Sequence, residues 1–361
     1  MTMMKIAFFG SSLVSAYWNG AATYYRGMIR ALAELGYEVT FYEPDAYERQ
    51  QHRDLDGPPW ARVVVYDNTT DAMWRTLEQA RSSSDALVKA SGVGVFDREL
   101  EAAVLDRKPG TLAIFWDVDA PATLDRLSDD PGDPFHALVP QYDLVLTYGG
   151  GEPVRLAYEA FGARECVPIY NALDPSTHFA VARDSRFACD LAFLGNRLPD
   201  REARVDEFFF EAARALPSKR FLLGGNGWSD KQKPQNVAYV GHVYTSDHNA
   251  FNCTPSAVLN ISRESMARYG FSPATRVFEA AGAGACLITD AWEGLETFLE
   301  PGTEVIAARS GAEVAHAVEQ LDPVRARQIG DAARQRILAS HTYTHRALQV
   351  SALLQGRAVA A

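Results

Sequence analysis

Short apolar segments alternate with helical segments along the chain, and this alternation constrains the fold more than any other feature. In the first half, we expect strands at 5–9, 38–42, 62–66, 86–89, 111–116, 143–147 and 165–169. In the second half, we expect them at 190–194, 220–223, 237–239, 257–261, 285–289 and 304–307. Helical patterns such as 23–35 and 152–161 lie between the strands. This order indicates βαβ units and parallel sheets.

The length of 361 residues fits two domains, each large enough to bury its own core. The segment 174–186 is polar and contains Pro175, so we expect the linker there. The prediction is an N-terminal Rossmann-like domain over 1–173 and a C-terminal one over 187–338. Two doubly wound domains would bind ligands beyond the carboxyl ends of their strands.

The composition is typical of a globular protein, with 47% hydrophobic and 22% charged residues. The net charge of −11 argues against non-specific binding to nucleic acid or to an anionic membrane. Neither a membrane span of about 20 apolar residues nor a signal-peptide pattern is evident, so we expect a cytoplasmic protein. The cysteines show no metal-binding spacing and are expected to be reduced core residues. They are Cys166, Cys189, Cys253 and Cys286.

The segment 269–290 gives the strongest indication of function. A tight loop leads into a helix that we expect to begin at Pro273, a residue suited to the first helical position. The free N–H groups at 274–276, with the helix dipole, would form an anion site for which a diphosphate is the commonest occupant. Arg276 and Glu279 share a helix face and suit a phosphate and a ribose diol. A surface ion pair on an ordinary buried helix explains the same spacing.

This segment resembles the nucleotide-sugar site of GT-B glycosyltransferases, in particular the CgeB-like (spore-maturation protein-like) group. The segments 168–179, 189–202, 237–243 and 341–348 extend the likeness over most of residues 170–350. The resemblance implies an α/β GT-B fold, in which two doubly wound Rossmann-like domains face each other across a cleft. It also implies a C-terminal helix, within 339–361, that crosses back to the first domain.

The resemblance further implies that the second domain binds a nucleotide-diphosphate-sugar donor. Glu279 would bind the ribose, Arg197 would reach the diphosphate, and the turn around His242 would contact the base. Of the other histidines, His178 is expected near the cleft and His248 is expected to be structural or exposed. The predicted donor-binding residues are Gly195, Arg197, His242, Val243, Ser272, Thr275, Arg276 and Glu279.

One departure from the family concerns the first of its two motif glutamates, which contacts the sugar in related retaining enzymes. Phe271 stands in its place, while Glu279 occupies the second position. Glu264, upstream in a different loop, is a candidate substitute. The sequence therefore leaves open whether transfer retains or inverts the anomeric configuration.

In the first domain, Asp117 and Asp119 follow a strongly apolar strand and are the candidate catalytic residues. A carboxylate there could take a proton from an acceptor hydroxyl or could bind sugar hydroxyls. Asp119 also suits the cap of the next helix. We expect no metal, since GT-B enzymes generally need none. The candidate acceptor-side residues lie in the loop after the first strand, which an ordinary βα loop also explains: Gly10, Ser11, Asn19 and Gly20.

The leading hypothesis is a metal-independent glycosyltransferase, without a further cofactor, that moves a sugar to an acceptor hydroxyl or amine. A catalytically degenerate GT-B protein that binds a nucleotide sugar or has a structural role is the main alternative. An epimerase or phosphorylase would share the fold, and the absence of GxGxxG argues against a nicotinamide-dependent dehydrogenase. The sequence identifies neither the sugar, the base nor the oligomeric state. The acceptor, a small molecule, a glycan or a protein, is equally open.

Overall fold

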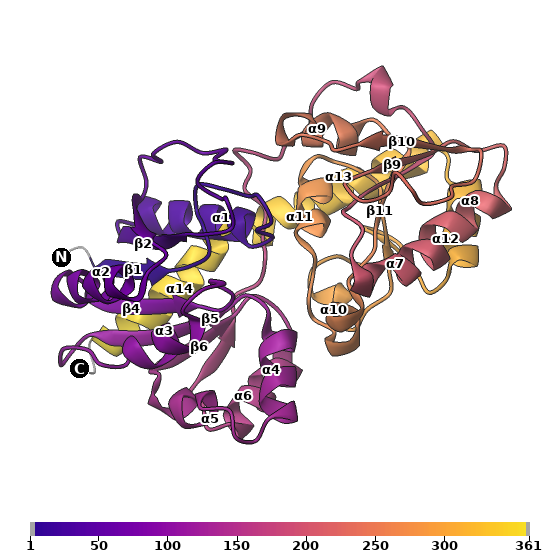
Figure 1. Cartoon of the computed structure of the whole chain (residues 1–361). Coiled ribbons are helices and arrows are strands. Elements are labelled where there is room, and N and C mark those ends of the chain that lie inside the picture. Colours follow the sequence, from indigo (N-terminus) through magenta and orange to yellow (C-terminus); the bar gives the residue numbers. More distant parts are fainter. Residues whose placement is uncertain (1–3, 359–361) are drawn as a thin grey trace. The chain divides into compact units, whose positions relative to one another are not determined.

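The computed structural model describes residues 4–358 and divides into two compact units. The first unit comprises Met1–Asn171 and Tyr343–Ala361, and the second comprises Ala172–Thr342. Each unit contains one parallel sheet with helices, so the predicted α/β class with two doubly wound sheets is confirmed (Figure 1). The segment 174–186, which we expected to be the linker, belongs to the second unit. Residues 1–3 and 359–361 of the predicted domains lie outside the described residues.

The sheet of the first unit has the strand order β3-β2-β1-β4-β5-β6-β7, and neighbouring strands are parallel. The order changes direction between β1 and β4, which makes the carboxyl ends of these strands the switch point of the sheet. Strand β5 is buried along its whole length because both faces of a parallel sheet are covered. The strands are β1 (Lys5–Phe9), β2 (Glu38–Asp45), β3 (Arg62–Asp67), β4 (Ala86–Ala90), β5 (Leu112–Asp117), β6 (Leu144–Thr147) and β7 (Cys166–Pro168).

The C-terminal helix α14 (Tyr343–Ala358) packs against α1 (Ala22–Glu34) in the first unit, as the sequence predicted (Figure 1). Gly27 makes this approach feasible, because a Cβ atom there would lie 2.2 Å from ring carbons of Tyr343. The hydroxyl groups of Tyr37 and Ser351 form a hydrogen bond of 2.8 Å. The other helices of the unit are α2 (Thr70–Ser83), α3 (Asp97–Ala103), α4 (Ala120–Asp129), α5 (Phe135–Leu138), η1 (Val139–Gln141) and α6 (Gly151–Ala160).

The sheet of the second unit has the order β10-β9-β8-β11-β12-β13, with its switch point between β8 and β11. Neighbouring strands are parallel here too. The strands are β8 (Leu191–Leu194), β9 (Phe221–Gly224), β10 (Val237–Gly241), β11 (Ala257–Asn260), β12 (Leu287–Asp290) and β13 (Ile306–Ala308).

The core of the second unit is rich in aromatic side chains, which include Phe193, Phe209, Phe221 and the fully buried Trp228. The phenylalanine side chains come from β8, from β9 and from the helical stretch 199–215, which contains one π-helical turn. The helices are η2 (Ser185–Phe187), α7 (Pro199–Val205), η3 (Asp206–Phe210), α8 (Glu211–Ala215), α9 (Thr245–Cys253), α10 (Glu264–Tyr269), α11 (Thr275–Gly282), η4 (Leu295–Thr297), α12 (Gly311–Gln320) and α13 (Pro323–Ser340).

The four cysteines are free, as predicted; Cys253 is partly exposed and the other three are buried. Burial raises the pKa of the Cys166, Cys189 and Cys286 thiols to about 12, so these thiols stay protonated at neutral pH. Between residues 4 and 358, no helix combines the length and apolar character needed to span a membrane.

Candidate functional site

The loop before helix α11 is tight because two consecutive residues have left-handed backbones. Gly270 has φ 68° and Phe271 has φ 44°. A Cβ on Gly270 would lie 2.9 Å from the Cβ of Glu293, so only glycine fits this position. The Ser272 hydroxyl donates to the Gly270 carbonyl at 2.8 Å, which occupies that hydroxyl within the loop. The proton of the Ser272 hydroxyl is therefore used within the loop, while its oxygen can still accept a hydrogen bond, and its contact with a ligand stays a prediction.

Helix α11 begins at Thr275, with Ala274 as its N-cap, and not at Pro273 as predicted. Proline prepares the turn from outside the helix, because Ala274 still has an extended backbone. The backbone N–H groups of Ala274, Thr275 and Arg276 make no hydrogen bond to another described residue. Unpaired N–H groups at the positive end of a helix dipole are suited to an anion such as a diphosphate.

Arg276 is partly buried and forms one hydrogen bond, from Nη1 to Oδ1 of Asn252, at 3.4 Å. Burial lowers the pKa of Arg276, and the neighbouring Glu279 partly counteracts this effect. The Nδ2 atom of Asn252 is buried without a partner among the described residues. A guanidinium and an amide, both with unused donors, therefore lie together beside α11.

Glu279 is 8% exposed, and its carboxylate accepts no hydrogen bond from any described residue. The closest polar contact is Nε2 of His178, at 3.6 Å from Oε1. Burial acts to raise the pKa of Glu279, but the two nearby histidines and Arg276 outweigh it and hold the pKa below its ordinary value. Glu279 is therefore an ionised, buried carboxylate whose acceptor capacity is unused.

Each of the two histidines beside Glu279 has one ring nitrogen within hydrogen-bond distance of a neighbouring protein oxygen. The Nδ1 atom of His178 lies 3.0 Å from the Thr177 hydroxyl, which leaves its buried Nε2 facing Glu279. The Nε2 atom of His248 lies 3.3 Å from the Val243 carbonyl. Burial lowers the pKa of His248, so that its ring is neutral at pH 7. His248 was expected to be structural or exposed, and its place here is a finding of the structure.

One potential ligand atom from each of His178, His248 and Glu279 lies within 4.8 Å of the others. Two imidazoles and a carboxylate are a ligand set that suits Zn²⁺. His178 also has the hydrogen bond on its other nitrogen that orients metal-bound histidines. The same atoms could equally contact the hydroxyl groups of a ribose. A Zn²⁺ ion and a ribose could not bind to these atoms at the same time.

The turn after β10, predicted to contact the base, is open. Gly241 has φ 71°, and nothing lies within 4 Å of the position of a Cβ there. His242 is exposed, packs edge-on against Tyr244 and has its Nδ1 3.4 Å from the Nδ2 of Asn226. Val243 is buried and bonds His248 through its carbonyl. The structure thus joins this turn to the environment of Glu279.

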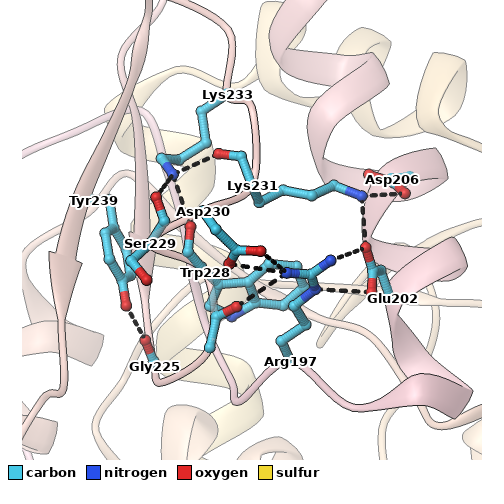
Figure 2. A network of polar contacts seen from close by, with 11 residues as sticks. Arg197, Glu202, Asp206, Gly225, Trp228, Ser229, Asp230, Lys231, Lys233 and Tyr239 are labelled. Carbon is cyan, nitrogen blue, oxygen red and sulfur yellow. Dashed lines mark hydrogen bonds and ion pairs between the residues drawn. The ribbon is translucent and has the colours of Figure 1, made fainter.

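The predicted role of Arg197 at the diphosphate is not supported by its contacts (Figure 2). Its Nε and Nη2 donate to the two carboxylate oxygens of Glu202, each at 2.8 Å, and its Nη1 donates to both oxygens of Asp230 at 3.1 Å. Lys231 joins the network by bonding Glu202 and Asp206. The guanidinium faces protein carboxylates and ties the 226–233 loop to α7.

Gly195, at the end of β8, has a structural reason to be glycine. A Cβ there would lie 2.9 Å from the Phe193 ring and 3.0 Å from a guanidinium nitrogen of Arg201. Its carbonyl accepts a bond of 2.7 Å from the indole of Trp228. The close packing expected of Gly195 is present, and it involves protein atoms.

Glu264, the candidate for the missing first glutamate, lies at the start of α10 with its side chain 65% exposed. It pairs with Arg204 at 3.2 Å. Arg204 also binds the fully buried Asp290 at 2.7 Å. Glu264 is thus the exposed member of a protein ion-pair network.

In the first unit, Asp117 is fully buried and both of its oxygens are occupied. Oδ1 accepts bonds from the Ser91 hydroxyl at 2.6 Å and from the backbone N–H of Asp119 at 3.0 Å. Oδ2 accepts a bond from the Tyr158 hydroxyl. A carboxylate with these partners joins the ends of β4 and β5 to α6. This arrangement argues against the predicted role of Asp117 as a general base. Asp119 is partly buried at the N-cap of α4, where its side chain makes no capping bond.

The predicted acceptor-side loop folds onto itself. The Ser11 hydroxyl donates to Oδ1 of Asn19 at 2.9 Å, and Nδ2 of Asn19 donates to the carbonyls of Ser12 and Ser15. Gly10 is required by the ring of Phe41, which lies 2.5 Å from the position of a Cβ. Nothing lies within 4 Å of a Cβ on Gly20, which therefore has open space beside it.

The chain resembles known proteins in one part of its sequence and in its whole fold. The model of a family described as glycosyl transferase-like matches residues 201–352, which is less than half of the chain. That segment contains Arg276 and Glu279. No curated protein sequence matches the chain.

Solved glycosyltransferase structures match almost the entire chain at low sequence identity. Sucrose-phosphate synthase from Thermosynechococcus elongatus has a TM-score of 0.72 at 14% identity, covering 99% of this chain and 100% of that one. HepE from Anabaena, in complex with UDP and glucose, has a TM-score of 0.66 at 13% identity, covering 98% and 100%. An alpha-glucosyltransferase in complex with UDP-glucose and DNA has a TM-score of 0.72 at 12% identity, covering 98% and 99%. The chain therefore has the predicted GT-B fold.

Proposed function

We propose that the protein is a glycosyltransferase that transfers a sugar from a nucleotide-diphosphate donor, bound in the second unit, to an acceptor hydroxyl or amine. The observation that carries the proposal is the Glu279 carboxylate, which is buried, ionised and without a hydrogen-bond donor. Its carboxylate oxygens have no hydrogen-bond donor among the described residues, so they can accept bonds from the hydroxyl groups of a ligand. The family likeness over 201–352 includes this residue.

In this proposal, each element around α11 binds a different part of the donor. The N–H groups of Ala274, Thr275 and Arg276, with the Arg276 guanidinium, bind the diphosphate. Glu279 binds the ribose diol, and the open turn at Gly241 contacts the base. Stabilising the negative charge that develops on the leaving diphosphate is the main contribution to rate. No step in this proposal requires a metal. We also propose that the protein belongs to the CgeB-like group and that it is cytoplasmic.

The catalytically degenerate alternative is favoured by one observation. Phe271 replaces the first motif glutamate, and Glu264 points into an ion pair with Arg204. A protein of this kind would bind the nucleotide without turning over the sugar conjugate. One structural neighbour is described with DNA, but the net charge of −11 argues against a nucleic-acid acceptor here.

A binding screen tests the proposal. UDP, GDP, dTDP, CDP and ADP, alone and as sugar conjugates, are added to the protein in a thermal-shift assay. A ligand of the folded state raises the melting temperature by mass action. We expect one base to give a clear shift that Glu279→Gln reduces, while the exposed control Glu319→Gln in α12 keeps it.

The same screen separates the two functions. Slow hydrolysis of the binding sugar conjugate, unchanged by EDTA, supports a metal-independent transferase. Binding with no turnover supports the degenerate protein. The absence of a shift with all five diphosphates contradicts the transferase and the nucleotide-binding protein, because each requires a nucleotide site at α11, and it supports a structural role instead.

A further inference from the structure

A hollow of about 430 Å³ lies in the first unit, in a part of the chain to which the donor site does not extend. Its walls come from the loops that follow β1, β2 and β4, the strands around the switch point of the sheet. This is where doubly wound sheets bind ligands, and the volume is that of a small-molecule site. The lining residues are Tyr17, Trp18, Tyr47, Glu48, Arg49 and Gly94.

Arg49 is a buried cation without a carboxylate partner. It is 7% exposed, and its Nη1 donates to the backbone carbonyls of Ser11 at 3.2 Å and Val93 at 3.4 Å. No described carboxylate forms an ion pair with its guanidinium, and its Nε is buried without a hydrogen-bond partner among the described residues. Burial lowers the pKa of Arg49, and the neighbouring Tyr47 and Glu43 counteract this effect only in part.

The acidic residues near Arg49 do not neutralise it directly. Glu43 is fully buried, but its oxygens accept bonds from the Ser12 hydroxyl, the Leu13 N–H and the Gln50 amide. Glu48 lines the hollow and is exposed to water. A buried guanidinium with unused donors is costly to maintain and is suited to bidentate binding of a carboxylate or phosphate.

Aromatic side chains form the walls around this cation. Trp18 is 73% exposed, Tyr47 is 55% exposed and Tyr17 is 37% exposed. The Tyr47 ring lies 5.0 Å from the Arg49 guanidinium, and its hydroxyl donates to the Gly94 carbonyl at 2.7 Å. Exposed rings around a hollow provide flat apolar surfaces on which a ligand ring can stack.

The backbone of the walls is strained at three positions outside glycine. Trp18, Tyr47 and Glu48 have φ values of 47°, 56° and 57°. Left-handed backbones of bulky residues cost of order 1–3 kcal/mol each and cluster at functional sites. Trp18 and Tyr47 line the hollow with much of their side chains exposed, and Tyr47 also packs closely on Gly94.

We propose that the hollow binds a ring-containing molecule with an anionic group, in which Arg49 holds the carboxylate or phosphate and Trp18 and Tyr47 stack on the ring. The identification of this molecule as the acceptor rests on the proposed glycosyltransferase function; the binding site itself does not. The exposed carboxylate of Glu48 would then face a neutral hydroxyl of the same ligand. None of these four residues was among the acceptor-side residues expected from the sequence.

The test is a calorimetric titration with matched pairs of ring compounds. The probes are 4-hydroxybenzoate against 4-hydroxybenzamide, phenyl phosphate against phenol, and glucose 6-phosphate against glucose. We expect at least one anionic member to bind about tenfold or more tightly than its neutral partner, because charge-assisted bonds to a guanidinium are the stronger ones. The first pair reports a carboxylate and the other two report a phosphate. Equal binding within every pair, or no binding by any anion, overturns the proposal.

Variants locate the binding in the hollow. Trp18→Ala removes an exposed ring and is expected to lower the affinity for the anionic probe about tenfold without changing the melting temperature. The control Trp74→Ala removes a 45% exposed indole on α2 and should change nothing. Arg49→Lys keeps a positive charge and loses the bidentate geometry, so it should weaken binding in a protein that still folds. Unchanged affinity in both Trp18→Ala and Arg49→Lys contradicts the assignment.

A nucleotide titration of the same variants distinguishes this proposal from the donor site. Trp18→Ala and Arg49→Lys should bind the preferred nucleoside diphosphate as the unmodified protein does. If the unmodified protein binds an anionic ring compound but no nucleotide, the proposed binding site in the hollow is supported and the proposed glycosyltransferase function is contradicted. If it binds a nucleotide but none of the ring probes, the nucleotide site is supported and the proposed binding site in the hollow is contradicted.

Discussion

Asp117 in the first unit and Glu279 in the second are both buried carboxylates, yet their surroundings are opposite. Asp117 accepts hydrogen bonds on both oxygens from Ser91, Tyr158 and a backbone N–H. Glu279 accepts none from a described residue and has His178 as its closest polar neighbour. Burial alone therefore does not mark a functional carboxylate. A carboxylate that the protein leaves unsatisfied is the better candidate for a ligand contact.

The same difference separates two arginines of the second unit. Arg197 directs its donors to Glu202 and Asp230 (Figure 2). Arg276, in contrast, makes one long bond to Asn252. Both were predicted to bind the diphosphate. We propose that role for Arg276, which makes only one long bond within the protein, whereas the contacts of Arg197 hold a loop.

The largest expected effect is the loss of stability in Asp117→Ala. The substitution leaves the Ser91 and Tyr158 hydroxyl groups buried without their acceptor, which costs about 2–5 kcal/mol of unfolding free energy. Urea unfolding measures the change, with the exposed Asp129→Ala on α4 as the control. Nucleotide affinity should be unchanged. A stable Asp117→Ala protein that has lost transfer alone would restore Asp117 as a catalytic residue.

The next effect separates the two arginines. Arg276→Ala should weaken the preferred nucleoside diphosphate about 10–100-fold, because bonds between charged groups contribute about 1.5–3 kcal/mol. Arg197→Ala should lower the melting temperature by releasing the 226–233 loop, with little change in affinity. Calorimetric titration of both proteins measures this, and a larger loss of affinity in Arg197→Ala would reverse the assignment.

A smaller effect is expected from Zn²⁺. If it enters between His178, His248 and Glu279, it occupies the carboxylate that the ribose needs, so excess Zn²⁺ should weaken nucleotide binding several-fold. Mg²⁺ should not, because it prefers oxygen ligands. His248→Gln removes one Zn²⁺ ligand and should abolish the effect. Stronger nucleotide binding with Zn²⁺ would instead indicate a metal that takes part in donor recognition.

The smallest effect is on stability at mildly acidic pH. The pKa of His248 is lowered in the folded protein, so the unfolded chain takes up a proton first as the pH falls below about 6.5. Stability is therefore full above that pH and declines below it. The lowered pKa of Glu279 adds a loss in the same direction below about pH 4.3. Urea unfolding of His248→Gln should show a flatter pH profile, and an unchanged profile contradicts this origin.

The fold was largely predictable because apolar runs such as 112–117 match strands that are buried on both faces. The start of α11 was misplaced by two residues, since Pro273 favours a helical φ while the two left-handed residues before it determine where the helix begins. Loop length and strain of this kind have no simple sequence pattern.

The site was predictable only where a contact is local. Arg276 and Glu279 are neighbours on one helix, and their spacing was readable. His248 lies beside them but belongs to α9, and Asp230 bonds Arg197 from a loop 33 residues away in the sequence. Neither contact can be predicted from the spacing of residues. Tyr158 similarly satisfies Asp117 from α6, which concealed the structural role of that carboxylate.

The measurement that tests the central claim most directly compares the preferred nucleoside diphosphate with its 2′,3′-dideoxy analogue, by calorimetry, in the unmodified protein and in Glu279→Gln. If Glu279 binds the ribose diol, the unmodified protein should prefer the natural ribose by about tenfold or more, and Glu279→Gln should lose most of that preference. An equal preference in the two proteins would show that the ribose is bound elsewhere and would contradict the account.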